Sequence, residues 1–311
     1  MSRYQSRKTS RVGTAPDRQR KLTLDAFISQ IYLPHVKARK RSWTLDERLA
    51  RNHLSRPFGS KIISSISSVD VEEWFNTLLE SGSAPATCNR ILAVFKTICA
   101  YAEARGFIES GTSPCADIRP FKVPYQRERY LSQPQARKLM EALENDPALS
   151  ARAIQLLLLT GARKNEILKA RWENVNIEQR ILTVPLSKSG KARHLVLSDM
   201  ALAVIKKLPR LNGNPWLFPG NIAGKPLVDL YDYWDKLRKE LDLEDVRIHD
   251  LRHTFASFLV NSGHSLYEVQ KMLGHGDPRT TMRYAHLGHA SLLAAAETVS
   301  GLLGKEETSA V

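Results

Sequence analysis

The stretch LGHGDPRTTMRYAH, residues 273–286, places a tyrosine in a polar segment that follows a glycine-histidine turn. Such a tyrosine has two explanations. Its ring can belong to a core with the hydroxyl turned outward, or its hydroxyl can serve as a nucleophile in covalent catalysis. The other reactive side chains of the chain decide between the structural and the catalytic explanation. His275 and Tyr284 are the first candidate site residues.

More reactive side chains lie just upstream, in RIHDLRHTF at 247–255. His249 and Arg252 are three positions apart and share one face of a predicted helix. His249 and His253 also have the i, i+4 spacing of a zinc-metalloprotease helix, but that motif requires glutamate where Asp250 stands. We therefore expect a pair of catalytic side chains here and no metal ion.

Two further segments supply charged side chains. In TGARKNEIL, residues 160–168, Arg163 and Glu166 can meet on one helix face, although an ordinary surface ion pair has the same spacing. The β-rich runs ILTVPL and RHLVL flank SKSGKA, which predicts a hairpin. Its tip carries Lys188 and Lys191, where a lysine is either solvated or long enough to reach into a site.

Apolar periodicity predicts a mainly α-helical protein with a small β-sheet. Helices are expected in the stretches 69–82 and 84–106, after an N-cap at Ser132, and through most of the chain from Asp199 onward. A proline-rich stretch marks a linker. The expected order is a basic flexible arm (1–21), a helical domain (22–116), the linker (117–130), a second domain (131–304) and a tail (305–311).

Composition points to a nucleic-acid partner. The chain has 311 residues and a net charge of +14, which attracts polyanions through Coulomb forces and counterion release. With 42% hydrophobic residues it is an ordinary globular protein, and it lacks the roughly 18-residue apolar run of a membrane span. No secretory signal is visible, so we expect a cytoplasmic, nucleoid-associated protein without membrane contacts. Three cysteines without CxxC spacing predict neither a zinc site nor disulfides.

Taken together, the motifs resemble the tyrosine recombinase (phage integrase) family. That family's pattern stands here, in order, as TGAR, the hairpin SKSGK, HDLR, LGH and RYAH. The resemblance implies a helical, SAM-like core-binding domain at 22–116 and an α+β catalytic domain at 131–304. It also implies a site-specific recombinase or integrase that cleaves and rejoins duplex DNA through a 3′-phosphotyrosyl intermediate, without metal, ATP or another cofactor.

The resemblance assigns roles to the candidate residues. Tyr284 is the nucleophile, and Arg163 and Arg252 neutralise the charge of the transition state. Lys188 is the general acid for the leaving 5′ oxygen, with Lys191 of the same turn as the alternative. The other three are His249 for proton transfer, His275 for a hydrogen bond to the phosphate, and Glu166 as a supporting residue that orients the site.

The implied partners are double-stranded DNA and further copies of the chain, as a dimer on each site and a tetramer in the synapse. Directionality factors or host DNA-bending proteins are additional candidates. The C-terminal stretch HASLLAAAETVSGLL, residues 289–303, packs on its own domain or docks on a neighbouring protomer, and the resemblance favours the second.

Two other functions stay open. A type IB topoisomerase uses similar residues to relax DNA, and a catalytically inactive accessory factor would bind DNA without cutting it. The complete residue set argues against the inactive protein. Among recombinases, integration or excision of a mobile element is favoured over resolution of chromosome dimers and inversion.

Overall fold

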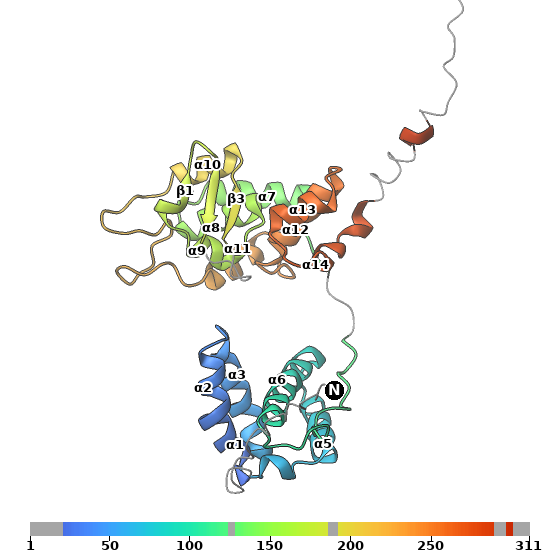
Figure 1. The fold of residues 1–311 in the computed structure, drawn as a ribbon. Coiled ribbons are helices and arrows are strands. Elements are labelled where there is room, and N and C mark those ends of the chain that lie inside the picture. Colours follow the sequence, from blue (N-terminus) through green and yellow to red (C-terminus); the bar gives the residue numbers. More distant parts are fainter. Residues whose placement is uncertain (1–20, 124–127, 186–191, 289–296, 301–311) are drawn as a thin grey trace, which may run out of the picture. The chain divides into compact units, whose positions relative to one another are not determined.

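A computed structural model of the chain describes residues 21–123, 128–185, 192–288 and 297–300. The chain divides into two compact units, residues 1–126 and 127–311 (Figure 1). Residues 1–20 of the predicted arm and the predicted tail lie outside the described residues. No helix of the described part is long and apolar enough to cross a membrane.

The first unit is a bundle of helices. Two long helical segments each contain a π-helical turn, and two regular helices follow. Ser67 caps α5 in a capping box with Asp70, and Pro85 occupies the first turn of α6, where its missing N–H removes no helical hydrogen bond. The elements are α1 (Leu24–Phe27), η2 (Ile28–Tyr32), α2 (Leu33–Lys37), α3 (Trp43–Leu49), η3 (Ala50–Leu54), α4 (Ser55–Phe58), η4 (Ile63–Ser65), α5 (Ser68–Glu80) and α6 (Pro85–Ala104).

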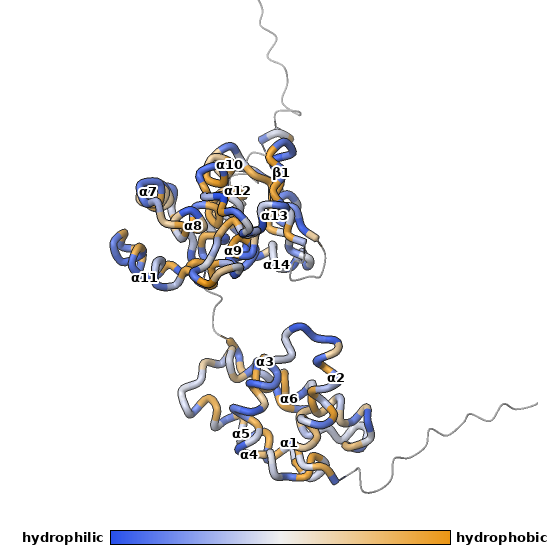
Figure 2. The backbone as a smooth tube through the Cα atoms, turned by 90° about the vertical axis from the view of Figure 1, so that its left-hand side faces the viewer, coloured by the Kyte–Doolittle hydropathy of each residue, from blue (hydrophilic) through white to orange (hydrophobic). Residues whose placement is uncertain are grey.

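The core of this unit forms around α6, whose apolar side chains are buried along its length. Figure 2 shows where hydrophobic residues recur along the backbone. The ring of Phe121 stacks on Phe75 at 4.2 Å between centroids, and Ile118 is buried in the same core. The packing of the first unit therefore extends into the stretch predicted as a linker. Cys88, Cys99 and Cys115 are buried free thiols.

The second unit is mainly helical with one three-stranded antiparallel sheet, in the order β1-β2-β3. This confirms the predicted fold class. The register pairs Ile181 with Val196 and Val184 with Arg193. The elements are α7 (Gln133–Glu144), α8 (Leu149–Thr160), α9 (Lys164–Leu168), η5 (Trp172–Asn174), β1 (Val175–Asn176), β2 (Ile181–Val184), β3 (Arg193–Val196), α10 (Asp199–Lys206), α11 (Tyr231–Glu240), α12 (Asp250–Asn261), α13 (Leu266–Leu273), α14 (Arg279–Met282) and η6 (Ala285–Gly288).

The buried helix α8 lies at the centre of this unit and contacts α7, α10 and α12. A smaller apolar cluster joins α12 and α13 to Tyr284. Between α10 and α11 the chain is not helical, so the prediction of helix from Asp199 onward is wrong there. Prolines interrupt this segment, and it forms isolated bridges instead, such as Arg171 with Trp216 and Pro219 with Pro226.

Candidate active site

Arg252 is held at the junction of three helices. It is 4% exposed, and its Nη1 and Nη2 atoms donate to the carbonyl oxygens of Gly161, at 2.6 Å, and Leu273, at 2.8 Å. These carbonyls lie at the C-terminal ends of α8 and α13, where helices carry partial negative charge. Burial, with Arg163 and Arg193 nearby, lowers the pKa of the guanidinium to about 9, so it remains charged at neutral pH.

Glu166 bridges two arginines. Its Oε1 accepts from Nη1 of Arg163 at 2.8 Å, and its Oε2 accepts from Nη1 of Arg193 at 2.7 Å. Arg193 lies on β3, is 8% exposed and also donates to the carbonyl of Met272 at 2.7 Å. Burial opposes ionisation of Glu166, but the charge of Arg193 and hydrogen bonds from Arg163 outweigh it and lower the pKa. The carboxylate thus fixes Arg163 against the sheet.

The glycine-histidine turn passes close to Arg193. Gly274 has φ +64°, and a Cβ atom at this position would lie 2.4 Å from Nε of Arg193, so only glycine fits without movement. Nδ1 of the next residue, His275, lies 2.8 Å from Oγ1 of Thr281. Burial, followed by the charges of Arg252 and other arginines, lowers the pKa of His275 to about 4. The ring is therefore neutral at neutral pH, with Nε2 left for another partner.

Tyr284 is a core residue with an engaged hydroxyl. It is 5% exposed, and Oη lies 2.6 Å from Nδ1 of His253. Burial raises the pKa of the phenol against the opposing charges of Arg283 and Arg252, so the hydroxyl keeps its proton. The ring of Tyr284 is therefore part of a core, and its hydroxyl faces a ring nitrogen of His253. The ring packs with Ala256, Val260, Val269 and Leu273.

Two histidines stand one helical turn apart at the start of α12. His249 is the exposed N-cap, and its ring lies 5.2 Å from that of His253, nearly perpendicular to it. Partial desolvation and the charge of Arg252 lower the pKa of His249. Burial, followed by Arg283 and His249, lowers the pKa of His253 to about 4. Both rings are uncharged at neutral pH, and of the two it is His253 that contacts Tyr284.

The structure brings some of the predicted site residues together. Arg163, Glu166 and His249 line one hollow of about 590 Å³, together with Lys169 and Arg171. Arg252 and His275 are close enough to Arg163 for its charge to lower their pKa values. Lys188 and Lys191 lie outside the described residues. Within the described ranges, no three His, Cys, Asp or Glu side chains are grouped to hold a metal ion.

Two residues of this site were not among the sequence-based candidates. Arg193 occupies an inward position of the strand RHLVL, where Leu195 and Leu197 are the other buried residues. A charged residue in the buried register of a short strand is a signal that could have identified it. His253 was weighed only as half of a metal pair.

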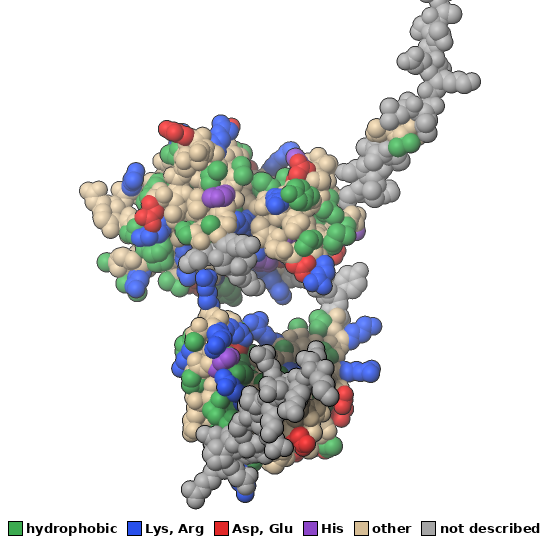
Figure 3. Space-filling model, in the orientation of Figure 1, with side chains coloured by type: hydrophobic (Ala, Val, Ile, Leu, Met, Phe, Trp, Pro, Cys, Tyr) green, Lys and Arg blue, Asp and Glu red, His purple; other side chains and the backbone are tan. Residues whose placement is uncertain are grey.

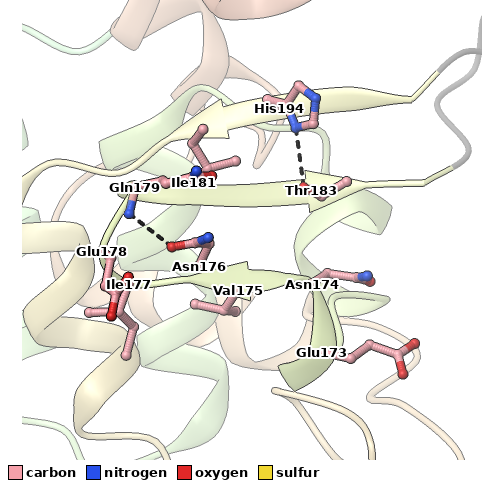
Figure 4. A pocket seen from close by; sticks show the side chains of 10 residues that line it. All are labelled: Glu173, Asn174, Val175, Asn176, Ile177, Glu178, Gln179, Ile181, Thr183 and His194. Carbon is pink, nitrogen blue, oxygen red and sulfur yellow. Dashed lines mark hydrogen bonds between the residues drawn. The ribbon is translucent and has the colours of Figure 1, made fainter.

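A second hollow, of about 760 Å³, lies on the sheet and contains none of the candidate residues (Figure 4). Figure 4 shows His194 Nδ1 against Thr183 Oγ1, at 3.1 Å, and the side-chain oxygen of Asn176 accepting from the N–H of Gln179, at 2.8 Å. Among the described residues, the candidate side chains gather around α12, α9, β3 and the glycine-histidine turn.

Known proteins share this architecture. Tyrosine recombinase XerC of Xanthomonas campestris is 29% identical over 237 residues, which cover 74% of this chain and 72% of XerC. The Tn1549 transposon integrase in complex with a circular intermediate DNA superposes with a TM-score of 0.71 at 21% identity, covering 89% of this chain and 99% of that one. A lambda integrase tetramer bound to a Holliday junction superposes with a TM-score of 0.66 at 18% identity. The match covers 85% of this chain and 77% of the lambda integrase chain. At these identities the two structures establish the fold alone.

Fold and relatives define the class as tyrosine recombinases, enzymes that act on DNA at specific sites. The model of the phage integrase family matches residues 129–290, more than half of the chain. This protein belongs to the phage integrase family.

Proposed function

We propose that the chain cleaves and rejoins duplex DNA through a covalent bond between Tyr284 and a 3′ phosphate, and that it integrates or excises a mobile element. The observation that supports this most is the placement of the Tyr284 hydroxyl, 2.6 Å from the ring of His253 and close enough to Arg283 and Arg252 for their charges to act on the phenol. Any buried tyrosine hydroxyl needs a hydrogen-bond partner, but a core does not require the charges of two arginines beside the phenol.

The chemistry follows from the residue types. Oη of Tyr284 attacks the phosphorus, an O–P bond forms and the bond from phosphorus to the 5′ oxygen breaks. Arg163 and Arg252 suit the non-bridging oxygens, because guanidinium groups present forked donors and remain charged. The new phosphotyrosyl ester replaces the broken ester, so rejoining is the reverse reaction and requires no ATP.

The remaining candidates complete the reaction. Lys188 would donate a proton to the leaving 5′ oxygen, and Lys191 is the alternative donor. His275 would donate to the phosphate from Nε2, since Nδ1 already faces Thr281. His249 lines the hollow beside Arg163 and would assist proton transfer there. Glu166 orients Arg163 through the hydrogen bond at 2.8 Å.

Double-stranded DNA is the proposed substrate. The hollow beside Arg163 is lined by the cations Lys164, Lys169 and Arg171. On the first unit, Lys and Arg side chains gather where α2 ends and α3 begins, around the exposed run 37–41 (Figure 3). Contacts of this kind to phosphates supply affinity without reading sequence.

A dimer on each site and a tetramer in the synapse are proposed for the assembly, acting on DNA in the cytoplasm. The lambda integrase tetramer on a Holliday junction supports the tetramer by analogy. The C-terminal stretch 289–303 would dock on a neighbouring protomer; residues 297–300 form a helical turn, and the rest lies outside the described residues. Directionality factors or DNA-bending proteins would set the direction of exchange.

A strand-exchange assay tests this function. Purified protein is incubated in EDTA with supercoiled plasmids that carry two copies of a candidate element junction. Recombinant circles are the expected product, and they should be absent with Tyr284→Phe and present with Tyr267→Phe, an exposed tyrosine on α13. Relaxation of the plasmid without exchange would instead indicate a topoisomerase, and binding without either product an inactive accessory factor.

A further inference from the structure

We propose that His253 holds the hydroxyl of the nucleophile and accepts its proton during attack. This inference rests on the proposed function, because it assigns a partner to Tyr284 in the same reaction. The sequence pattern assigned proton transfer near Tyr284 to His249, but the ring nitrogen within hydrogen-bonding distance of the hydroxyl belongs to His253. His249 lies on the exposed side of that ring, at the N-terminus of α12.

The geometry fits a donor-acceptor pair. The distance of 2.6 Å from Tyr284 Oη to His253 Nδ1 is that of a short hydrogen bond. The ring centroids are 5.9 Å apart and the planes are inclined at 50°, so the rings do not stack and the contact runs through the polar atoms. A neutral imidazole has one nitrogen that accepts, and in the proposed tautomer, with its proton on Nε2, Tyr284 donates and Nδ1 accepts.

The surroundings hold the hydroxyl in place before DNA arrives. A cavity of about 10 Å³ adjoins the pair, which is room for at most about one water molecule. Ser257, one turn further along α12, also lines it, and its buried Oγ has no hydrogen-bond partner in the described part of the chain. The bond to His253 therefore sets the starting position of the nucleophile.

Charged groups surround this pair on each side. Within α12 they are Arg252 and His249, and in the chain after α14 they are Arg283 and His286. The segment before α7 adds Glu128, whose carboxylate lies 3.3 Å from His286, and Arg129. Burial, followed by the charges of Arg283 and His249, keeps His253 neutral in the free protein. A DNA phosphate bound by Arg163 and Arg252 offsets their charge, which makes the imidazole a better base when attack begins.

The proton balance of the step is complete. As the Oη–phosphorus bond forms, the phenolic proton passes to Nδ1 and His253 becomes an imidazolium. The electron pair of the broken bond goes to the 5′ oxygen, which takes its proton from the general acid proposed at Lys188. On rejoining, the 5′ hydroxyl returns its proton to the lysine that had given it up, and His253 returns the other proton to Tyr284.

The test measures single-turnover cleavage of nicked suicide substrates by His253→Ala and His253→Asn. The side-chain oxygen of asparagine can accept a hydrogen bond near the position of Nδ1 but takes up no proton. We expect alanine to slow cleavage by about 100-fold or more, the usual range for loss of an acid-base group, and asparagine to remain slow. DNA binding in gel shifts and far-UV circular dichroism should match wild type. His264→Ala, an exposed histidine beyond α12, is the matched control.

A substrate with sulfur in place of the bridging 5′ oxygen separates base from acid, because a thiolate leaves without a proton. His253→Ala should stay slow on it, whereas Lys188→Ala should recover. The assignment would be overturned if His253→Ala cleaved at the wild-type rate or if His253→Asn recovered that rate fully. It would also be overturned if the sulfur substrate rescued His253→Ala and Lys188→Ala equally. Tyr284→Phe keeps the two proposals apart: if it also cleaves, the proposed function itself fails.

Discussion

Nη1 of Arg193 lies 2.7 Å from Oε2 of Glu166, and both side chains are buried. The pair joins β3, the second strand of the predicted hairpin, to the carboxylate that holds Arg163. A change at Arg193 therefore alters the position of a proposed phosphate ligand on another element.

Loss of Arg193 should destabilise the second unit. Arg193→Leu removes one partner of a buried ion pair and also frees the carbonyl of Met272. Breaking such a pair costs about 3–5 kcal/mol. Urea denaturation should show a loss of this order, compared with almost none for Arg137→Leu on the exposed face of α7. Equal stability of the two variants would contradict the role given to the pair.

The same network predicts a pH dependence of stability. The pKa of Glu166 lies below its ordinary value, so in acid the unfolded chain binds more protons at this residue than the folded chain does. Its contribution is present above the ordinary glutamate pKa of about 4.3 and is lost as the pH falls below it. The unfolding free energy of wild type should therefore fall more steeply than that of Glu166→Gln as the pH is lowered from about 5 to about 3. Parallel curves would show that Glu166 does not contribute in this way.

Gly274 should tolerate no side chain. Its φ of +64° is strained for alanine, and the added Cβ would meet Arg193 at 2.4 Å. We expect Gly274→Ala to lower stability by more than about 1 kcal/mol, because strain and displacement of Arg193 add together. Gly276→Ala is the control two residues on, since a Cβ there meets nothing within 4 Å. Thermal unfolding of both variants measures the difference in stability. A Gly274→Ala variant as stable as Gly276→Ala would contradict the prediction.

His275 should be neutral in the free protein over most of the acid range. Its pKa is lowered to about 4 by burial and by arginines, whereas an unperturbed histidine titrates near 6.5. The ring signals assigned by comparison with His275→Gln should therefore shift near pH 4 in an NMR titration. Added DNA should move that transition upward, because phosphate offsets the arginine charge. A transition near 6.5 without DNA would exclude the proposed environment.

Arg252→Lys should impair cleavage although the charge is kept. Lysine cannot donate to both helix-terminal carbonyls, those of Gly161 and Leu273, and at the same time present a fork to phosphate. Loss of one electrostatic donor typically costs about 10²–10³ in rate. Suicide-substrate cleavage should fall by this amount, with Arg137→Lys unaffected. Near-normal cleavage would mean that Arg252 is structural.

Much of the fold could be predicted because local signals agree with it. Ser132 caps α7 as its position suggested, with its hydroxyl accepting from the N–H of Gln135, and both predicted strands form. The two-residue strand β1 was not predicted, since its existence depends on pairing with β2. The non-helical segment before α11 was misjudged because its prolines were given too little weight.

The site was predictable as a set of residue types and unpredictable as a set of contacts. The motifs identified arginines, histidines and a tyrosine without showing which atoms meet. Arg193 meets Glu166 across 27 positions, and His253 meets Tyr284 across 31. Such pairings depend on how α12 and β3 pack in the folded unit, which periodicity along one segment does not specify.

The most direct measurement is covalent capture of DNA by Tyr284. Wild type, Tyr284→Phe and Tyr267→Phe are incubated in EDTA with nicked suicide substrates, and adducts that survive SDS are mapped by peptide mass spectrometry. We predict an adduct on Tyr284 in wild type and Tyr267→Phe, with a free 5′ hydroxyl on the DNA, and none in Tyr284→Phe. An adduct on another residue, or specific binding with no adduct in any protein, would contradict the proposed function.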